Sequence, residues 1–416
     1  MEQIGIPLLD NVLKIFPWHN SKEYIKLQFR YGVELQAILQ DLVLLPLLKF
    51  DSINDMSQAI GNNKNKYYQL LQDPHINWSL LFQEISFALF LSILKIYQNS
   101  TDPSFQSRWR IRIIVDDTLI RRWSSKIARV YNAYNHVDKY YMQAQKMVML
   151  AISVGDGKFV FPLFYQIQLP TSHAQHMTDE TQVLNILDAL YMEMRQNELS
   201  FRGVRFVCDS AYATKDILCT ARLFGLEYYG SLVWSWRFEL EDGTTILVRD
   251  LKHGHIPAPL RQSSYFPLGY YRLRAFHPDL GHVVLLITPY IEYGSNLTRY
   301  WVYITSNLSV NSITIRHEHT IRWSIEQMFK TFKHTLGIRF YHSINDCGQQ
   351  GWFALTCLRF LFVQFSIKLA SRFSTLRWGL PAKKFSLTKM IRYIRDHYCL
   401  DSKLNRITHL HYVLVT

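Results

Sequence analysis

A segment near residue 320 combines one carboxylate with three cationic side chains. On a helix of HTIRWSIEQMFKTFKHTLGIRF, Glu326, Lys330 and Lys333 fall within about 80° of Arg322, and apolar residues fill the adjoining arc. The apolar residues are Ile325, Met328, Phe329, Phe332 and Leu336. A metal-binding acid beside phosphate-gripping groups would have this pattern, because Arg forks onto phosphate oxygens and Lys is a point charge. The alternative is a solvated face with favourable four-residue ion pairs.

Further acids come where two apolar runs end. Asp116 or Asp117 closes the strand predicted in IRIIVDDTLI, and Asp209 closes the strand predicted in VRFVCDS. In α/β sheets, sites form at strand ends. Carboxylates are hard ligands that suit Mg²⁺, and two such ions about 3.5 to 4 Å apart can activate an attacking oxygen and stabilise a leaving one. A single Asp at a strand end is commonly a cap or turn residue, so the prediction depends on all three acids together.

The elements that must position these acids alternate between strand and helix. We expect a strand from Ile111 that ends in its acids, a hairpin turning at 155–157, a helix at about 178–199, a strand ending at Asp209, a helix at 212–224 and a strand at 226–236. This is the order of a ribonuclease H-like α/β domain. Strand-rich and turn-rich sequence from 238 to 303 predicts a β insertion. One long amphipathic helix is expected from about Ile315 past Lys333.

The first 105 residues are predicted to be mostly helical. Within them Ser52 can cap one helix, Gly61 can make a sharp turn, and 63–72 can form a second helix that carries Lys64 and Lys66. Such a pair outlines a helix-turn-helix, whose second helix enters the major groove of DNA. Two ordinary packed helices of a helical domain are the alternative.

The Arg322 helix resembles the signature of DDE transposases of bacterial insertion sequences marked by Tyr, Arg, Glu and Lys. In that family two, three and six residues separate the four positions, and Arg322, Glu326 and Lys333 match every gap. His319 stands where the family has Tyr, and an imidazole can still donate a hydrogen bond to a phosphate. The resemblance covers about residues 110 to 370.

The same resemblance extends to residues outside the helix. VDDT resembles the family's first-acid strand, in which Thr or Ser commonly comes two positions after the ligand, and this favours Asp116 over Asp117. VCDSAY resembles the second-acid strand and gives Asp209. Trp301 in WVYITSNL matches a Trp that can stack on a displaced base, although a Trp on a strand is ordinarily a core residue.

The resemblance implies a transposase that binds the terminal inverted repeats of an insertion sequence and catalyses strand cleavage and strand transfer. Two Mg²⁺ ions, for which Mn²⁺ can substitute, would be held by Asp116, Asp209 and Glu326. DNA would be contacted by His319, Arg322, Lys330, Lys333, Trp301, Lys64 and Lys66. Because the protein must join two element ends, at least a homodimer is expected in the active complex. No glycine-rich phosphate loop occurs, so no nucleotide cofactor is expected.

The expected fold class is α/β, with a ribonuclease H-like catalytic domain interrupted by a β-strand insertion between helical terminal regions. The expected domains are a helical DNA-binding domain at 1–105, the first part of the core at 106–237, the β insertion at 238–305, the second part of the core with the Glu326 helix at 306–370, and a basic helical region at 371–416.

Charge and cysteine usage indicate the partner and the compartment. The 46 Lys and Arg residues exceed the 33 Asp and Glu residues, so a net charge of +13 points to a polyanion such as double-stranded DNA. Five cysteines without a CxxC pair and a start without a secretory leader favour a reducing, cytoplasmic and nucleoid-associated location. Trp352–Ala370 is long enough to span a membrane, but Arg359, Gln364 and Lys368 inside it favour a buried core helix.

Two other functions remain compatible with these residues. A metal-dependent nuclease of the same fold would cut strands and never join them. A DNA-binding regulator whose acids no longer work would bind DNA without cutting it.

Overall fold

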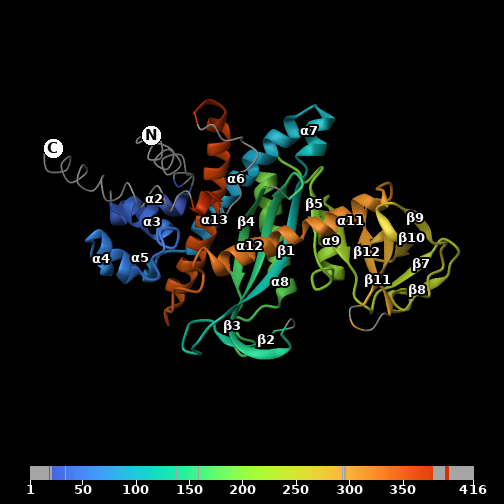
Figure 1. The fold of residues 1–416 in the computed structure, drawn as a ribbon, viewed down its shortest axis with the longest axis horizontal. Coiled ribbons are helices and arrows are strands. Elements are labelled where there is room, and N and C mark those ends of the chain that lie inside the picture. The colour runs from blue at the N-terminus through green and yellow to red at the C-terminus, as the bar shows by residue number, and fades with distance from the viewer. Residues whose placement is uncertain are drawn as a thin grey trace. The chain divides into compact units, whose positions relative to one another are not determined.

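The computed structural model describes residues 18, 21–32, 34–135, 138–157, 159–292, 294, 297–377 and 389–392. The chain forms two compact units, each assembled from separate stretches of sequence. Unit 1 comprises Met1–Leu89, Leu119–Lys146 and Phe329–Thr416, and unit 2 comprises Phe90–Thr118 and Met147–Met328. The protein is therefore a mixed α/β structure in which the described residues before β1 (Ile111–Arg121) and after β12 (Thr298–Thr305) are mainly helical (Figure 1).

Unit 1 is mainly helical. Its elements are α2 (Lys22–Tyr31), α3 (Glu34–Leu44), α4 (Ile53–Ile60), α5 (Lys64–Gln72), the start of α6 (Trp78–Asn99), the last turns of α12 (Trp323–His334) and α13 (Asp346–Arg377). α13 packs against α3 and α5, and Figure 1 shows this group in blue and red. β2 (Tyr131–Asn135) pairs antiparallel with the first residues of β3 (Tyr140–Val154).

The apolar part of α13 forms the core of unit 1. Every side chain from Trp352 to Val363 is buried, so the prediction of a buried core helix is confirmed for this stretch. Arg359 is tolerated there because its guanidinium donates to the carbonyl oxygens of Leu42 and Leu336. Among the described residues one helix, α6, is long and apolar enough to cross a membrane, and the core helices of soluble proteins pass the same test.

The predicted pair of helices at 52–72 is present as α4 and α5. The Ser52 hydroxyl caps α4 by accepting the Asp55 N–H, and Gly61 ends α4 in the left-handed region at φ +70°. Asn63 caps α5 in the same way. The outline drawn from sequence is therefore confirmed, and DNA binding by this pair stays a prediction.

Unit 2 is built on one mixed sheet. Its first part contains β1 (Ile111–Arg121), most of β3, β4 (Phe159–Ile167), β5 (Arg205–Val207) and β6 (Glu227–Ser231), with α7 (Pro103–Arg108), α8 (Asp179–Gln196) and α9 (Lys215–Leu223) along the chain. The strand order is β4-β3-β1-β5-β6. β1, β5 and β6 are mutually parallel, whereas β4 runs antiparallel to β3.

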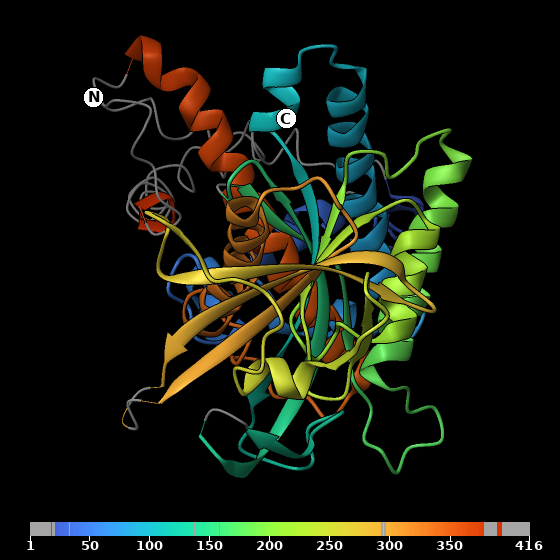
Figure 2. The same ribbon diagram turned by 90° about the vertical axis from the view of Figure 1, so that its right-hand side faces the viewer.

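The predicted β insertion continues this sheet. It contains β7 (Arg237–Leu240), β8 (Thr245–Leu247), α10 (Val248–Lys252), β9 (Arg261–Ser263), β10 (Phe266–His277), β11 (Gly281–Ile291) and β12 (Thr298–Thr305). Figure 2 shows its long strands in yellow and orange as a twisted antiparallel ribbon. β12 pairs with β6, so the last strand of the insertion extends the sheet that carries β1 and β5.

Two expectations from the sequence are wrong, and a third concerns residues that the structure mostly does not describe. The single long helix past Lys333 is instead two helices, α11 (Ser312–Ile321) and α12, because the Ile325 N–H bonds to the Arg322 carbonyl three residues back and interrupts the four-residue pattern. β1 does not end at its acids but runs on to Arg121, since it stays paired with the long strand β3. Beyond Arg377, the predicted basic region lies outside the described residues except for 389–392.

Candidate active site

Two of the predicted acids come from neighbouring parallel strands. The register of β1 and β5 pairs Arg112 with Arg205 and Ile114 with Val207. Continued by two residues, this register sets Asp116 level with Asp209. Asp209 follows the end of β5, where its carboxylate accepts N–H groups of the next turn. The sheet therefore brings two acids that are far apart in sequence to the same level.

The third acid comes from α12. Glu326 lies one turn after Arg322, which sits between α11 and α12 and keeps helical backbone angles (φ −50°, ψ −35°). The apolar arc predicted beside it is confirmed, because Ile325, Met328 and Phe332 are all buried. Packing of this arc leaves the Arg322 and Glu326 side of the helix for polar contacts.

The guanidinium of Arg322 joins two of the acids. Its Nη1 donates to Asp116 Oδ2 at 2.6 Å and its Nη2 donates to Glu326 Oε1 at 2.8 Å. The Arg322 side chain is only 12% exposed, and its Nε is buried without a hydrogen-bond partner. Charge-assisted bonds of this kind are stronger than neutral ones. The Arg322 guanidinium thus holds the carboxylates of Asp116 and Glu326 close to each other.

Burial shifts the pKa values of Asp116 and Asp209 upward, toward the protonated form. Burial raises the pKa of Asp116 to about 7 although Arg322 opposes the shift, and the charges of Asp209 and Asp117 raise it further. Burial also raises the pKa of Asp209, again against Arg322. One guanidinium does not compensate the desolvated carboxylates, so an additional cation would be bound favourably here.

Asp117, the alternate to Asp116, has a different partner. The Tyr212 hydroxyl donates to Asp117 Oδ2 at 2.8 Å, and burial raises the pKa of Tyr212, so the phenol keeps its proton. Successive side chains of a strand point to opposite faces, which separates Asp117 from the Arg322 face of β1. Asp116 is the member of the pair that meets Arg322.

The three acids are ligands of the type that a divalent ion takes, but two of them, Asp116 and Glu326, contact a guanidinium instead. Three carboxylates offer hard oxygen ligands of the kind that Mg²⁺ prefers. Within the described ranges, no three His, Cys, Asp or Glu side chains are grouped closely enough to hold a metal ion. Arg322 lies between Asp116 and Glu326, so a metal that used both would displace at least one of these ion pairs.

His319, the substitute for the family Tyr, packs on an aromatic ring. Its imidazole meets the Tyr303 ring edge-on at 4.7 Å between centroids. Burial lowers the pKa of His319 to about 3, and the charges of Arg322 and Arg316 add to the effect. At neutral pH the imidazole is therefore uncharged and can offer a phosphate only a neutral hydrogen bond.

Trp301 is not a core residue. Its side chain on β12 is 44% exposed, and its ring stacks on Tyr290 of β11 with centroids 5.0 Å apart. The expectation that Trp301 is a core residue is therefore wrong, and its stacking on a base stays a prediction.

The four predicted DNA-binding lysines belong to unit 1. Lys330 is exposed on α12, and Lys333 on the same helix is partly exposed. Lys64 and Lys66 are exposed on α5, where Lys64 bonds to Asn54 and Lys66 pairs with Glu34 at 2.7 Å. These lysines are accessible to a polyanion, and no finding tests whether they bind one.

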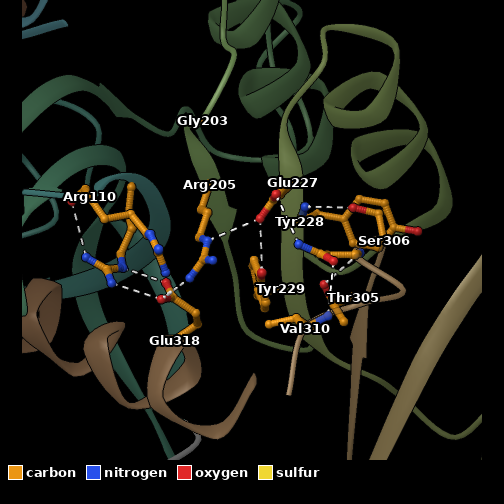
Figure 3. Close-up of polar contacts among 12 residues, drawn as sticks. Arg110, Gly203, Arg205, Glu227, Tyr228, Tyr229, Thr305, Ser306, Val310 and Glu318 are labelled. Atoms are coloured by element: carbon orange, nitrogen blue, oxygen red, sulfur yellow. Dashed lines mark hydrogen bonds and ion pairs between the residues drawn. The ribbon is translucent and has the colours of Figure 1, made fainter. Parts of the chain in front are cut away.

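Sequence analysis missed a second ionic cluster in unit 2. Glu318 on α11 is fully buried, and both its oxygens accept from Arg112, at 2.5 Å (Nε) and 2.9 Å (Nη2). Arg205 Nη1 donates to the same carboxylate at 2.5 Å. Figure 3 shows the Arg205 side chain between Glu318 and Glu227. A signal existed in the sequence, because RIIVD and RFVCD both carry Arg four residues before the Asp.

Comparisons with known proteins give little further guidance. No protein-family model and no curated protein matches the chain. Among solved structures it is similar to the NurA nuclease from Sulfolobus solfataricus, with a TM-score of 0.23 and 10% sequence identity over 57% of this chain and 82% of that one. A likeness at that TM-score carries no argument about fold or activity, so function must be argued from the site.

Proposed function

We propose that the chain is a DDE transposase that cleaves and joins DNA strands with divalent metal ions. The observation that carries this proposal is that Arg322 bonds to both Asp116 and Glu326, while the continued register of β1 and β5 sets Asp209 level with Asp116. Asp116 and Asp209 act on each other electrostatically, and both act on Arg322. The three positions are those implied by the resemblance to the Tyr-Arg-Glu-Lys transposases.

The order of elements supports the same proposal. Strands and helices from β1 to β6 follow the order expected for a ribonuclease H-like domain, with a hairpin first and two helix-linked parallel strands after it. The β insertion falls between Asp209 and Glu326, as the resemblance implies. We therefore propose a ribonuclease H-like catalytic domain in unit 2.

Asp116, Asp209 and Glu326 would hold the divalent ions. When bound, such ions lower the pKa of water and stabilise charge on the attacking and leaving oxygens of a phosphoryl transfer. Arg322 would pass from the carboxylates to a DNA phosphate, for which its planar fork is equally suited. His319 would donate a neutral hydrogen bond to the strand.

Other residues would bind the DNA around the reacting phosphate. Lys330 and Lys333 continue α12 beyond Glu326 and would neutralise phosphates. Trp301 would stack on an unpaired base, and Lys64 and Lys66 on α5 would contact the duplex of an element end. A homodimer would hold two ends together.

Removal of single metal ligands tests the catalytic assignment. Asp209→Asn and Glu326→Gln are expected to lower Mg²⁺-dependent cleavage of an element-end duplex by on the order of 10⁴-fold, as loss of an essential catalytic group does. Binding of the end should survive both changes. Asp188→Asn, an exposed acid on α8, is the matched control and should cleave normally. Full cleavage by Asp209→Asn would show the assignment to be wrong.

Strand joining separates this proposal from the two alternatives. A pre-cut end with a 3′-hydroxyl, supplied with a supercoiled target, should yield joined product. Cleavage without joining would identify a nuclease, and binding without either reaction would identify a regulator.

A further inference from the structure

The Glu318 cluster ties α11 to the beginning of two strands of the sheet. Arg112 also donates to the carbonyl oxygens of Arg110 and Gly155, so its guanidinium is held from both sides. Arg205 is shared between Glu318 and Glu227, the latter on β6. Arg112 and Glu318 are 2% and 0% exposed, so water does not loosen this contact. One carboxylate of α11 is thereby fixed to β1 and β5 at once.

The same cluster reaches the loop that leads into α11. Glu227 accepts from the Tyr229 hydroxyl at 3.1 Å and from Asn307 Nδ2 at 3.1 Å. Asn307 in turn accepts the N–H of Val310 just before the helix. Figure 3 shows Tyr229 and Glu227 beside Arg205 on this side. The start of α11 is therefore anchored through its loop as well as through Glu318.

Arg322 links this cluster to the acids. It lies four residues after Glu318, at the end of α11, and its guanidinium donates to Asp116 Oδ2 at 2.6 Å and to Glu326 Oε1 at 2.8 Å. Arg112, which holds Glu318, and Asp116 lie on the same strand, and four strand residues advance about 13 Å. α11 is therefore attached to β1 at two places, through Glu318 and through Arg322.

We propose that Glu318 is a positioning residue that sets the register of α11 against β1 and β5. The clamp at Arg112 and Arg205 holds α11 at Glu318, and Arg322 at the end of that helix consequently reaches Asp116. The catalytic consequence rests on the proposed function, whereas the register itself does not. A shift by one helical residue would move Glu326 by about 1.5 Å, enough to misalign a reacting geometry.

A double-mutant cycle tests the register without any assay of activity. Glu318→Gln, Asp116→Asn and the double variant are unfolded with urea in the absence of metal. Sites about 13 Å apart with no shared partner normally contribute independently. If Glu318 positions Arg322 against Asp116, the two changes should couple by about tenfold or more in the unfolding equilibrium constant.

Leu187→Ala provides the matched control. It opens a cavity at a fully buried position of α8, so it destabilises unit 2 without touching the cluster. Its effect should add to that of Asp116→Asn within about twofold in the same equilibrium constant. Additive behaviour of Glu318→Gln with Asp116→Asn would overturn the proposal. If Glu318→Gln does not fold, Glu318→Asp, which keeps the charge and shortens the reach, takes its place in the cycle.

Cleavage then shows whether the register matters for chemistry. At saturating Mg²⁺ and DNA, Glu318→Gln should cleave about 10²-fold more slowly with DNA affinity unchanged, because misplacement by about 1 Å costs that much. Leu187→Ala should cleave at the normal rate below its unfolding temperature. If the wild-type protein does not cleave DNA, the proposed function is refuted. The double-mutant cycle then still tests the register of α11, because it needs no assay of activity. Normal cleavage by Glu318→Gln would overturn the catalytic part of the inference.

Discussion

Unit 2 has two charged clusters, and the pKa values of their carboxylates are shifted in opposite directions. We call Glu318 with its two arginines the arginine end, and Asp116 and Asp209 with Arg322 the acid end. At the start of β1 and β5, Glu318 is enclosed by Arg112 and Arg205, and these arginines lower its pKa although burial opposes them. Four residues after each of these arginines in the sequence, burial raises the pKa of Asp116 and of Asp209, although Arg322 opposes both shifts. Glu318 on α11 supplies the counter-charge to the two arginines, and Arg322 at the end of the same helix supplies the counter-charge to Asp116.

The difference separates a structural ion cluster from a site that can take a ligand. A buried carboxylate that receives two guanidinium groups keeps its charge and has little to gain from a further cation. Carboxylates that remain desolvated with less compensation gain much from one. Perturbed pKa values of this second kind gather at functional sites. This difference agrees with the proposed function, in which the acid end would hold metal, and with the proposed role of Glu318 in positioning α11.

Removal of an arginine that binds Glu318 should have the largest effect on the free energy of unfolding. Arg112→Met leaves the buried Glu318 with one partner fewer, and the free energy of unfolding should fall by about 3 to 5 kcal/mol. Urea unfolding at neutral pH measures the change. Arg299→Met is the control, because its pair with Glu292 is more than a third exposed and should contribute less than about 1 kcal/mol. Equal effects of the two substitutions on the free energy of unfolding would mean that the Glu318 cluster stabilises the protein no more than an exposed ion pair does.

The two ends should also respond to pH with opposite sign. The folded pKa of Asp116 is about 7, above the ordinary 3.8, so between about pH 4 and 7 the folded state holds a proton that the unfolded chain has lost. This group therefore makes metal-free protein less stable as pH rises through that window, by up to about 1.4 kcal/mol per pH unit. Glu318, with its lowered pKa, contributes stability above its ordinary 4.5 that is lost as the pH falls below it.

Asp116→Asn isolates the first of these effects. Thermal or urea unfolding across pH 4 to 8 should show the variant gaining on wild type as the pH rises and matching it near pH 4. A constant difference between the two proteins would mean that the Asp116 carboxyl titrates normally.

Removal of the Arg322 guanidinium should strengthen the binding of a divalent metal ion at the acids that it contacts. Arg322→Ala removes the guanidinium that lies against Asp116 and Glu326, so Mn²⁺ should bind DNA-free protein about tenfold more tightly, which corresponds to about 1.4 kcal/mol. Calorimetric titration with Mn²⁺ measures this affinity. Arg316→Ala is the control, since that arginine bonds to Tyr303. Weaker Mn²⁺ binding by Arg322→Ala would indicate that the guanidinium organises the acids and does not compete with metal.

The smallest effect is expected from Lys330 and Lys333, the two lysines that follow Glu326 on α12. Lys330→Ala and Lys333→Ala should each reduce the slope of log affinity for an element end against log salt by about 0.9 without lowering the unfolding temperature. Titrations from low to moderate salt provide the slopes. Lys95→Ala, an exposed lysine of α6, should leave the slope unchanged. Parallel losses of binding and of stability would mark the two lysines as structural.

Local patterns in the sequence predicted several parts of the fold. The apolar arc beside Arg322 and the apolar run from Trp352 both proved to be buried, because hydrophobic spacing reflects the face that a helix packs. Ser52 and Gly61 bounded α4 because capping and left-handed turns depend on single residue types. The break at Arg322 and the extension of β1 to Arg121 were missed, since hydrogen bonds outside the local pattern decide them.

The sequence by itself determined which acids and cations exist and how far apart they lie along each strand or helix. Only the tertiary structure decided that β1 lies against β5, that Arg322 turns to Asp116 and Glu326, and that Glu318 is enclosed by two arginines. The reason is physical: the charge state and role of a buried group depend on how much water it loses and on which opposite charge replaces that water. Both quantities come from neighbours that are distant in sequence, so no local pattern contains them.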